Sequence, residues 1–334
     1  MRTDLANAAL LAGALALSSW AATLPGGAPV APPTGGGAAD APALGASEVE
    51  DARGVAVPVR AYERIVSLST ISDHVLLRLV EPERLVSVTE YSARHPAAWQ
   101  FGARPTVASS GQLEAVLALK PDLVVVTLYS DEAYLARLRE AGVQVFDLGD
   151  MRGVETTRAS IRALGALLNL RGRAAALERS YDRELAALDA VVPDAELEPG
   201  MYLSVYGDTF FGATAGTSYA DTLRLGGVRD LAAERGFVDW PQYTAEQLLQ
   251  LDPPLIVTLE GMGDVLRGHA LLSSLRACGP AGRIVEIDGA YNGDAGLGIV
   301  EAAHQILVRV HPGRVPSLPD PLRRPAPPSP PDGR

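Results

Sequence analysis

Apolar residues along the chain fall into two blocks, in which short β-branched runs alternate with stretches of helical spacing. In the first block the expected strands are 64–68, 85–88, 123–127 and 143–146, and the expected helices are 73–79 and 134–141. The second block repeats the alternation, with strands at 201–206, 255–259 and 284–287 and helices at 219–225, 271–277 and 298–310. This alternation is typical of parallel βα units. The sequence therefore predicts two α/β lobes.

The segment between the blocks, residues 154–191, has apolar positions at helical spacing throughout, as at Ile161, Leu164 and Leu168. A single helix of about 35 residues would be roughly 50 Å long. Two helices separated at Gly172 fit the pattern equally well. Both interpretations predict a rigid helical connection between the lobes.

The two ends of the chain differ from the blocks in composition. An apolar run from Ala8 to Leu17 follows Arg2 and ends in small residues, which is the pattern of a secretory signal. An uncleaved anchor is the alternative, although the run is short for a membrane span, and no cysteine follows it to carry a lipid. The expected organisation is a signal peptide at 1–22, a disordered Pro/Gly/Ala-rich linker at 23–58, lobes at 59–152 and 193–312 joined by a backbone helix at 153–192, and a disordered Pro-rich tail at 313–334.

Charge and cysteine content exclude several classes of protein. The net charge of -11 argues against nucleic acid as a partner, because phosphate neutralisation needs clustered Lys and Arg. With Cys278 as the single cysteine, the chain can form no internal disulfide. The residues after the first strand, 68–72, include no glycine for a dinucleotide turn, and no Gly-x-Ser-x-Gly elbow occurs. We therefore do not expect an enzyme; a two-lobed α/β enzyme is the weakest alternative.

Two matched stretches stand about 130 residues apart, at 111–126 and at 240–257. Each predicts a short helix with an early glutamate, a turn marked by proline, and a buried strand. The glutamates are Glu114 and Glu246. The repetition suggests one device used once in each lobe.

These stretches, with Arg64–Ser69 and the loop–helix unit 216–227, carry a resemblance that covers about 64–310. The chain resembles the substrate-binding proteins of ABC importers in the helical-backbone class, which are periplasmic receptors for cobalamin, haem and ferric siderophores. The cobalamin-binding branch is the most similar. The resemblance implies two Rossmann-like lobes joined by a long rigid α-helix, with a ligand cleft between the lobes. The sequence departs from the family at 69–74, where Ser-Thr-Ile-Ser-Asp-His replaces the common Ser-Pro-x-x-Thr-Glu.

The resemblance also implies that Glu114 and Glu246 dock on arginines of an ABC permease dimer. A carboxylate in the first turn of a helix faces its positive end, and bidentate arginine recognition would add orientation. The alternative is that both are simple helix-terminal charges. Thr244 lies two residues before Glu246, which is not the spacing of a capping box with that glutamate.

Candidate ligand-binding residues follow from the rule that ligands lie at the carboxyl ends of strands in open α/β sheets. They are Tyr91, Arg94, His95, Tyr129, Phe210, Phe211, Trp240 and Tyr291. Flat aromatic faces suit a metal chelate, a corrinoid first and haem or a ferric siderophore as alternatives. His74 and His95 are weak candidates for metal ligation, and no intrinsic cofactor is expected. We expect an exported, monomeric receptor in the periplasm; an orphan chelate-binding or sensing protein without an importer is the second alternative.

Overall fold

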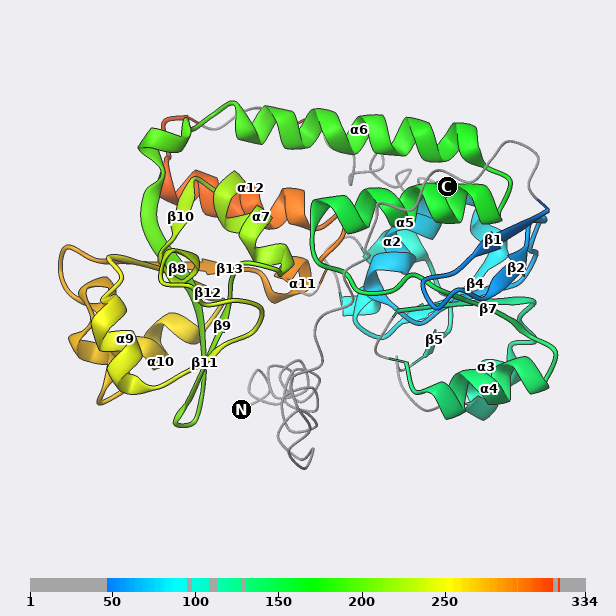
Figure 1. Ribbon diagram of the computed structural model, residues 1–334, viewed down its shortest axis with the longest axis horizontal. Coiled ribbons are helices and arrows are strands. Elements are labelled where there is room, and N and C mark those ends of the chain that lie inside the picture. The colour runs from blue at the N-terminus through cyan, green and yellow to red at the C-terminus, as the bar shows by residue number, and fades with distance from the viewer. Residues whose placement is uncertain are drawn as a thin grey trace, which may run out of the picture. The chain divides into compact units, whose positions relative to one another are not determined.

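The computed structural model describes residues 47–94, 98–107, 113–127, 130–292, 294–314 and 318, which belong to one compact unit of the chain (Figure 1). The expected signal segment, most of the expected linker and most of the expected tail lie outside these residues. Within the described part, no helix combines the length and the apolar composition needed to cross a membrane.

The first lobe is built on a five-stranded parallel sheet. Its strand order is β5 (Thr106–Val107), β4 (Leu85–Thr89), β3 (Ile65–Ser67), β6 (Leu123–Val126) and β7 (Gln144–Asp147). Its helices are α2 (Thr70–Leu79), α3 (Leu113–Ala118) and α4 (Glu132–Glu140), with 3-10 turns at Pro82–Arg84, Ser92–Arg94 and Ala98–Phe101. Residues of β6 alternate between two cores, because Leu123 and Val125 face one side of the sheet and Val124 and Val126 the other. The four strands predicted from apolar runs are confirmed.

A β-hairpin precedes this sheet, formed by β1 (Glu48–Glu50) and β2 (Ala56–Pro58). Val49 and Val57 are buried in the core of the first lobe. The predicted disordered linker is therefore wrong for residues 48–58. The composition of the predicted linker is dominated by the Pro and Gly residues that precede the hairpin. The alternation that places Val49 and Val57 inward is only three residues long on each strand, so it gives a weak strand signal.

The connection between the lobes consists of two helices, α5 (Val154–Leu167) and α6 (Arg171–Asp189). They separate at Asn169, whose φ of 56° is left-handed, and not at Gly172, which lies inside α6. Asn is one of the few residues that adopt this conformation readily. Gly165 of α5 faces Ala174 of α6, with no room for a side chain between them. Figure 1 shows α6 running alongside α5 and α12, which its contacts with both helices also show.

The second lobe has a six-stranded mixed sheet, which differs from the all-parallel arrangement that the alternation predicts. The order is β11 (Gln242–Tyr243), β9 (Thr209–Ala213), β8 (Glu198–Tyr206), β12 (Leu255–Leu259) and β13 (Arg283–Ile287), and β10 (Val228–Asp230) also pairs with β8. Strands β8 and β9 form an antiparallel hairpin, whose turn contains Gly207 at a φ of 56°. A two-residue turn of this kind joins antiparallel strands without a crossover helix.

The helices of the second lobe cover both faces of its sheet. They are α7 (Ser218–Leu225), α8 (Leu231–Glu234), α9 (Ala245–Leu251), α10 (Met262–Gly268), α11 (Gly289–Asn292) and α12 (Ile299–Val310), and a 3-10 turn at Asp194–Glu196 precedes the sheet. Met201 and Leu203 of β8 lie in the core beside α9 and α10, and Tyr202 lies in the core beside α7 and α12. The helix predicted at 271–277 is instead two 3-10 turns, Leu272–Ser274 and Arg276–Cys278.

Candidate functional site

The two matched stretches fold into the same local structure, once in each lobe. In the first lobe α3 is followed by Lys120 at a φ of 50°, then Pro121 and β6. In the second, α9 is followed by Asp252 at a φ of 37°, then two prolines and β12. The left-handed residue ends each helix, and the proline prevents its continuation. The expected helix–turn–strand repeat is confirmed.

Glu114 and Glu246 occupy the same place in these units, the second residue of the helix, and both are exposed. The sequence interpretation of the α9 cap was incomplete: a capping box does form, between Thr244 and Gln247. This leaves Glu246 outside the cap, where it accepts a hydrogen bond from Gln250 at 3.3 Å. The carboxylate of Glu246 is therefore not needed to begin the helix.

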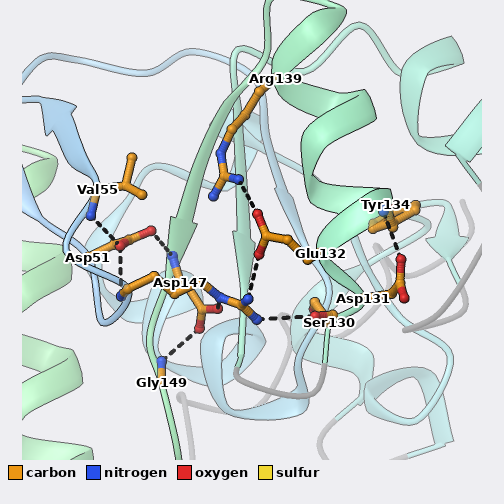
Figure 2. A network of polar contacts seen from close by, with 10 residues as sticks. Asp51, Val55, Ser130, Asp131, Glu132, Tyr134, Arg139, Asp147 and Gly149 are labelled. Atoms are coloured by element: carbon orange, nitrogen blue, oxygen red, sulfur yellow. Dashed lines mark hydrogen bonds and ion pairs between the residues drawn. The ribbon is translucent and has the colours of Figure 1, made fainter.

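The carboxyl ends of β6 and β7 are tied together by Arg53 of the N-terminal hairpin. Figure 2 shows the network around Ser130, Glu132 and Asp147. The guanidinium of Arg53 pairs with Asp147, whose side chain is fully buried at the end of β7, and with Glu132 at the start of α4. It also donates to the carbonyl of Ser130, 3.1 Å away, in the loop after β6. The bond to Asp147 raises the pKa of Arg53 further. The hairpin thus fixes two loops at the edge where ligands bind in parallel sheets.

The Asp51 carboxylate holds the turn of the same hairpin. Asp51 accepts hydrogen bonds from the backbone N–H groups of Arg53 and Val55, each at 2.9 Å, and from that of Asp147 at 3.3 Å. Sequence reasoning missed Asp51 and Arg53. The Asp-Ala-Arg-Gly turn between two short alternating runs was the available signal.

At the carboxyl ends of β3 and β4 the first lobe has a buried polar cluster instead of an open loop. Asp73 of α2 accepts hydrogen bonds from the N–H and the hydroxyl of Thr89, at 2.9 and 2.6 Å. Burial raises the pKa of Asp73 to about 6, although hydrogen bonds from Ser67, Thr89 and Ser92 oppose the shift. His74 beside it is 3% exposed and meets the ring of Phe101 edge-on. His74 is thus a core residue of α2, which argues against the metal role that was considered for it.

The remaining first-lobe candidates differ in how much of them the structure describes. Tyr91 is partly exposed and directly precedes the 3-10 turn that ends at Arg94. The Arg94 side chain is 58% exposed and pairs at 4.0 Å with Glu90. His95 and Tyr129 lie outside the described residues, so their predicted roles stay predictions.

In the second lobe, the loop position predicted for Phe210 and Phe211 is wrong, because both residues lie within β9. Phe210 is 4% exposed, packs in the core and meets the ring of His269 edge-on. Phe211 is partly exposed and pairs with Gln242 of β11. The missed hairpin explains the error, since it turns the chain back where a crossover loop was expected.

Trp240 is the large aromatic side chain of this lobe that faces solvent, with 56% of its surface exposed. Its ring packs edge-on against Tyr219, at the start of α7, and Tyr219 packs in turn against Tyr202 of β8. A small hollow lies beside Tyr219, lined also by Ser218, Tyr291 and Asp294. Its cavity volume of about 10 Å³ is far below that of typical ligand pockets. The hollow alone is therefore too small for a corrin or porphyrin ring.

Asp294 organises the loop between α11 and α12, through which the second lobe contacts the first. Its carboxylate accepts from the N–H groups of Gly296 and Gly298, each at 2.9 Å. The carbonyl of Gly296 accepts a hydrogen bond from the hydroxyl of Tyr181 of α6, and a Cβ on Gly296 would lie 2.8 Å from Ile71 of α2. Burial raises the pKa of Asp294 to about 6. A buried carboxyl thus supports the contact of this loop with α2 and α6.

Sequence reasoning also missed Arg152, which contacts the other lobe directly. It lies in the loop between β7 and α5 and donates to Asp239 at 2.7 Å and to the carbonyl of Gly216 at 3.0 Å. The hydrogen bond to Asp239 raises the pKa of Arg152 further. Among the residues that the structure describes, no group of three or more His, Cys, Asp or Glu side chains could hold a metal ion.

The fold is that of a two-lobed α/β protein, with a helical connection between the lobes and with loops gathered at strand ends. Residues 65–290 match the family described as "Periplasmic binding protein", and the chain belongs to this family. The predicted resemblance to substrate-binding proteins of this class is confirmed. The family consists of binding proteins.

Relatives and solved structures agree with this assignment. The chain is 30% identical to a cobalamin-binding protein of Halobacterium salinarum over 59% of this chain and 53% of that protein. It is 24% identical to an uncharacterized ABC transporter substrate-binding lipoprotein of Bacillus subtilis, over 45% and 49% of the two chains. The chain thus spans about half the length of the relatives it matches. A periplasmic heme binding protein from Pseudomonas aeruginosa has a TM-score of 0.65 at 25% identity, covering 77% of this chain and 95% of that one.

Proposed function

We propose that this protein is an exported, monomeric substrate-binding protein that captures a metal chelate and delivers it to an ABC permease. The observation that carries the proposal is the pair of matched units with Glu114 and Glu246. Each lobe exposes one carboxylate at the same helical position, and neither carboxylate forms an ion pair with another of the described residues. A permease dimer presents two equivalent surfaces. An arginine on each surface would hold one carboxylate through two parallel hydrogen bonds.

The proposed ligand is a corrinoid, with haem and a ferric siderophore as the alternatives. Two relatives support this range, because one is named as a cobalamin-binding protein and the other as a heme-binding protein. A flat macrocycle offers a broad apolar face to an exposed indole such as that of Trp240. Tyr91, Arg94, His95, Tyr129, Phe211 and Tyr291 complete the proposed contacts. Phe210 is left out because its side chain belongs to the core.

Reversal of both docking charges tests delivery. The double variant Glu114→Arg, Glu246→Arg should lose uptake of the chelate by cells while the purified protein keeps its affinity. The matched control reverses Glu140 and Asp264, one exposed acid on each lobe and each on a helix. Uptake that persists in the first variant, or is lost equally in the control, would show that these glutamates do not dock. A receptor that works without an importer would then be the better description.

Absorbance spectra identify the ligand separately. Purified protein is incubated with cyanocobalamin, hemin or a ferric siderophore and then passed through a desalting column. A bound corrinoid co-elutes with its own visible bands, and bound haem shifts its Soret band. Elution without any of the three colours would reject the proposed ligand class.

A further inference from the structure

Arg152 joins the first lobe to two separate segments of the second. It follows β7 in the chain and lies one residue before Gly153, which caps α5. Its Nη1 atom donates to Asp239 and to the carbonyl of Gly216, and its Nε atom pairs with Asp150. The Arg152 side chain is 52% exposed. One guanidinium therefore crosslinks the loop before α7 and the segment before β11.

These two segments are also bonded to each other by their backbones. The N–H of Thr214 donates to the carbonyl of Asp239 at 3.1 Å, and the N–H of Asp239 donates to the carbonyl of Ala215 at 2.7 Å. Gly216 has a φ of 87°, and a Cβ on it would lie 2.9 Å from the Asp239 carboxylate. The absence of a side chain at Gly216 is thus what lets Asp239 and Arg152 approach the turn.

Asp239 has a left-handed backbone, with a φ of 56°. This conformation is unfavourable for most L-residues other than glycine, so surrounding contacts help to stabilise it. The bond from Arg152 to the Asp239 carboxylate is one such contact. The backbone conformation of Asp239 determines the direction in which the chain continues into the next residue, Trp240.

Trp240 needs this support because burial does not fix its ring. More than half of its surface is exposed, and its ring meets that of Tyr219 edge-on, with the centroids 5.6 Å apart. Tyr219 follows the same turn that Arg152 holds at Gly216. Both rings of the pair are therefore attached to segments that Arg152 bonds.

We propose that Arg152 is a positioning residue of the ligand site, which fixes Asp239 and the Gly216 turn and so holds Trp240 edge-on to Tyr219. The consequence for binding rests on the proposed function, because it requires that Trp240 contact the chelate. Exposed ion pairs contribute little to stability. Loss of Arg152 should therefore change the Trp240 ring more than it changes the fold.

The experiment uses the full chain with Trp20 and Trp99 replaced by Phe, so that Trp240 is the only tryptophan. Arg152→Gln, Arg152→Lys and Asp239→Asn are compared with Arg229→Gln, a half-exposed arginine of the second lobe that pairs with Glu234. Acrylamide quenching of ligand-free protein reports the Trp240 ring. Titration with cyanocobalamin and with hemin reports affinity, and thermal unfolding reports the fold.

Arg152→Gln and Asp239→Asn should raise the quenching constant of Trp240 about twofold and weaken chelate binding about five- to tenfold, because an anchor that is no longer held must be ordered on binding. Arg152→Lys should recover part of the quenching effect and part of the affinity, since lysine keeps the positive charge but lacks the planar guanidinium with its several N–H donors. Unchanged quenching in Arg152→Gln, or an equal change in Arg229→Gln, would overturn the proposal. If quenching changes but wild-type protein binds neither chelate, the positioning role stands and the proposed ligand class fails.

Discussion

The ring of Trp240 meets that of Tyr219 edge-on, with the ring centroids 5.6 Å apart and the planes at 83°. Tyr219 packs against Tyr202 at 4.2 Å, so three aromatic rings lead from the sheet of the second lobe to the surface. Edge-to-face contacts of this kind add to the stability of aromatic clusters beyond burial. An exposed indole backed by a packed row loses little entropy when a flat ligand covers it.

Replacement of Trp240 by Ala should weaken chelate binding by about 1–3 kcal/mol, since it removes an aromatic anchor. Phe at this position should keep part of the affinity because it keeps a flat face. Titration of purified protein with cyanocobalamin and hemin measures the effect. Val238→Ala is the control, because Val238 is 62% exposed and lies two residues away. Equal affinity of wild type and Trp240→Ala would remove Trp240 from the site.

Four of the five strands in the sheet of the first lobe could be predicted because short apolar runs mark them, such as 123–126, whose residues are all buried. The helix–proline–strand repeat was visible for a similar reason, since its proline and its glutamate are local signals. The β8–β9 hairpin was missed although Gly207 and Asp208 form a recognisable turn between two β-rich runs.

The contacts of Arg53 and Arg152 could not be predicted from local pattern. Arg53 reaches Asp147 across 94 positions, and Arg152 reaches Asp239 across 87. An arginine beside a glycine looks the same in sequence whether it is solvated or bridges two lobes. The pairing becomes visible only when the fold brings the two segments together.

Arg53→Gln should destabilise the protein by about 2–4 kcal/mol, because it leaves the buried carboxylate of Asp147 without its ion-pair partner. Urea unfolding monitored by circular dichroism measures the change. Arg139→Gln is the matched control, since Arg139 pairs with the exposed Glu132 of the same network. That variant should cost less than about 1 kcal/mol. Equal effects of the two substitutions would contradict the importance given to Asp147.

The raised pKa of Asp294 predicts that the stability of the protein depends on pH. Burial raises its pKa to about 6, above the value of 3.8 in the unfolded chain, so the folded state binds the proton more tightly. A raised pKa gives stability that is complete below about pH 4 and is lost as the pH rises through about 6. At about 1.4 kcal/mol for each pKa unit, the contribution is roughly 3 kcal/mol. Asp73 acts in the same direction.

Asp294→Asn removes this titration. The free energy of unfolding of wild type minus that of the variant should therefore decrease as the pH rises from about 4 to about 7. Urea titrations at several pH values measure it. Asp264→Asn serves as the control, since the Asp264 side chain is 99% exposed. A difference that stays constant with pH for Asp294→Asn would show that its carboxyl does not titrate in this range.

Gly153 marks the entry to the connection between the lobes, and its substitution should be costly. Its φ of 134° is open to glycine alone, and a Cβ would lie 2.3 Å from the Asp221 carboxylate. That carboxylate accepts a bond from the N–H of Val154, so Gly153→Ala strains the backbone and displaces a contact at the start of α5. We expect a loss of about 2–4 kcal/mol in urea unfolding. Gly172→Ala is the comparison: it lies within α6 with open space around it, so alanine should stabilise the helix by about 0.5 kcal/mol. Destabilisation by Gly172→Ala would contradict the open space assigned to Gly172 within α6, and tolerance of Gly153→Ala would contradict the strain assigned to Gly153.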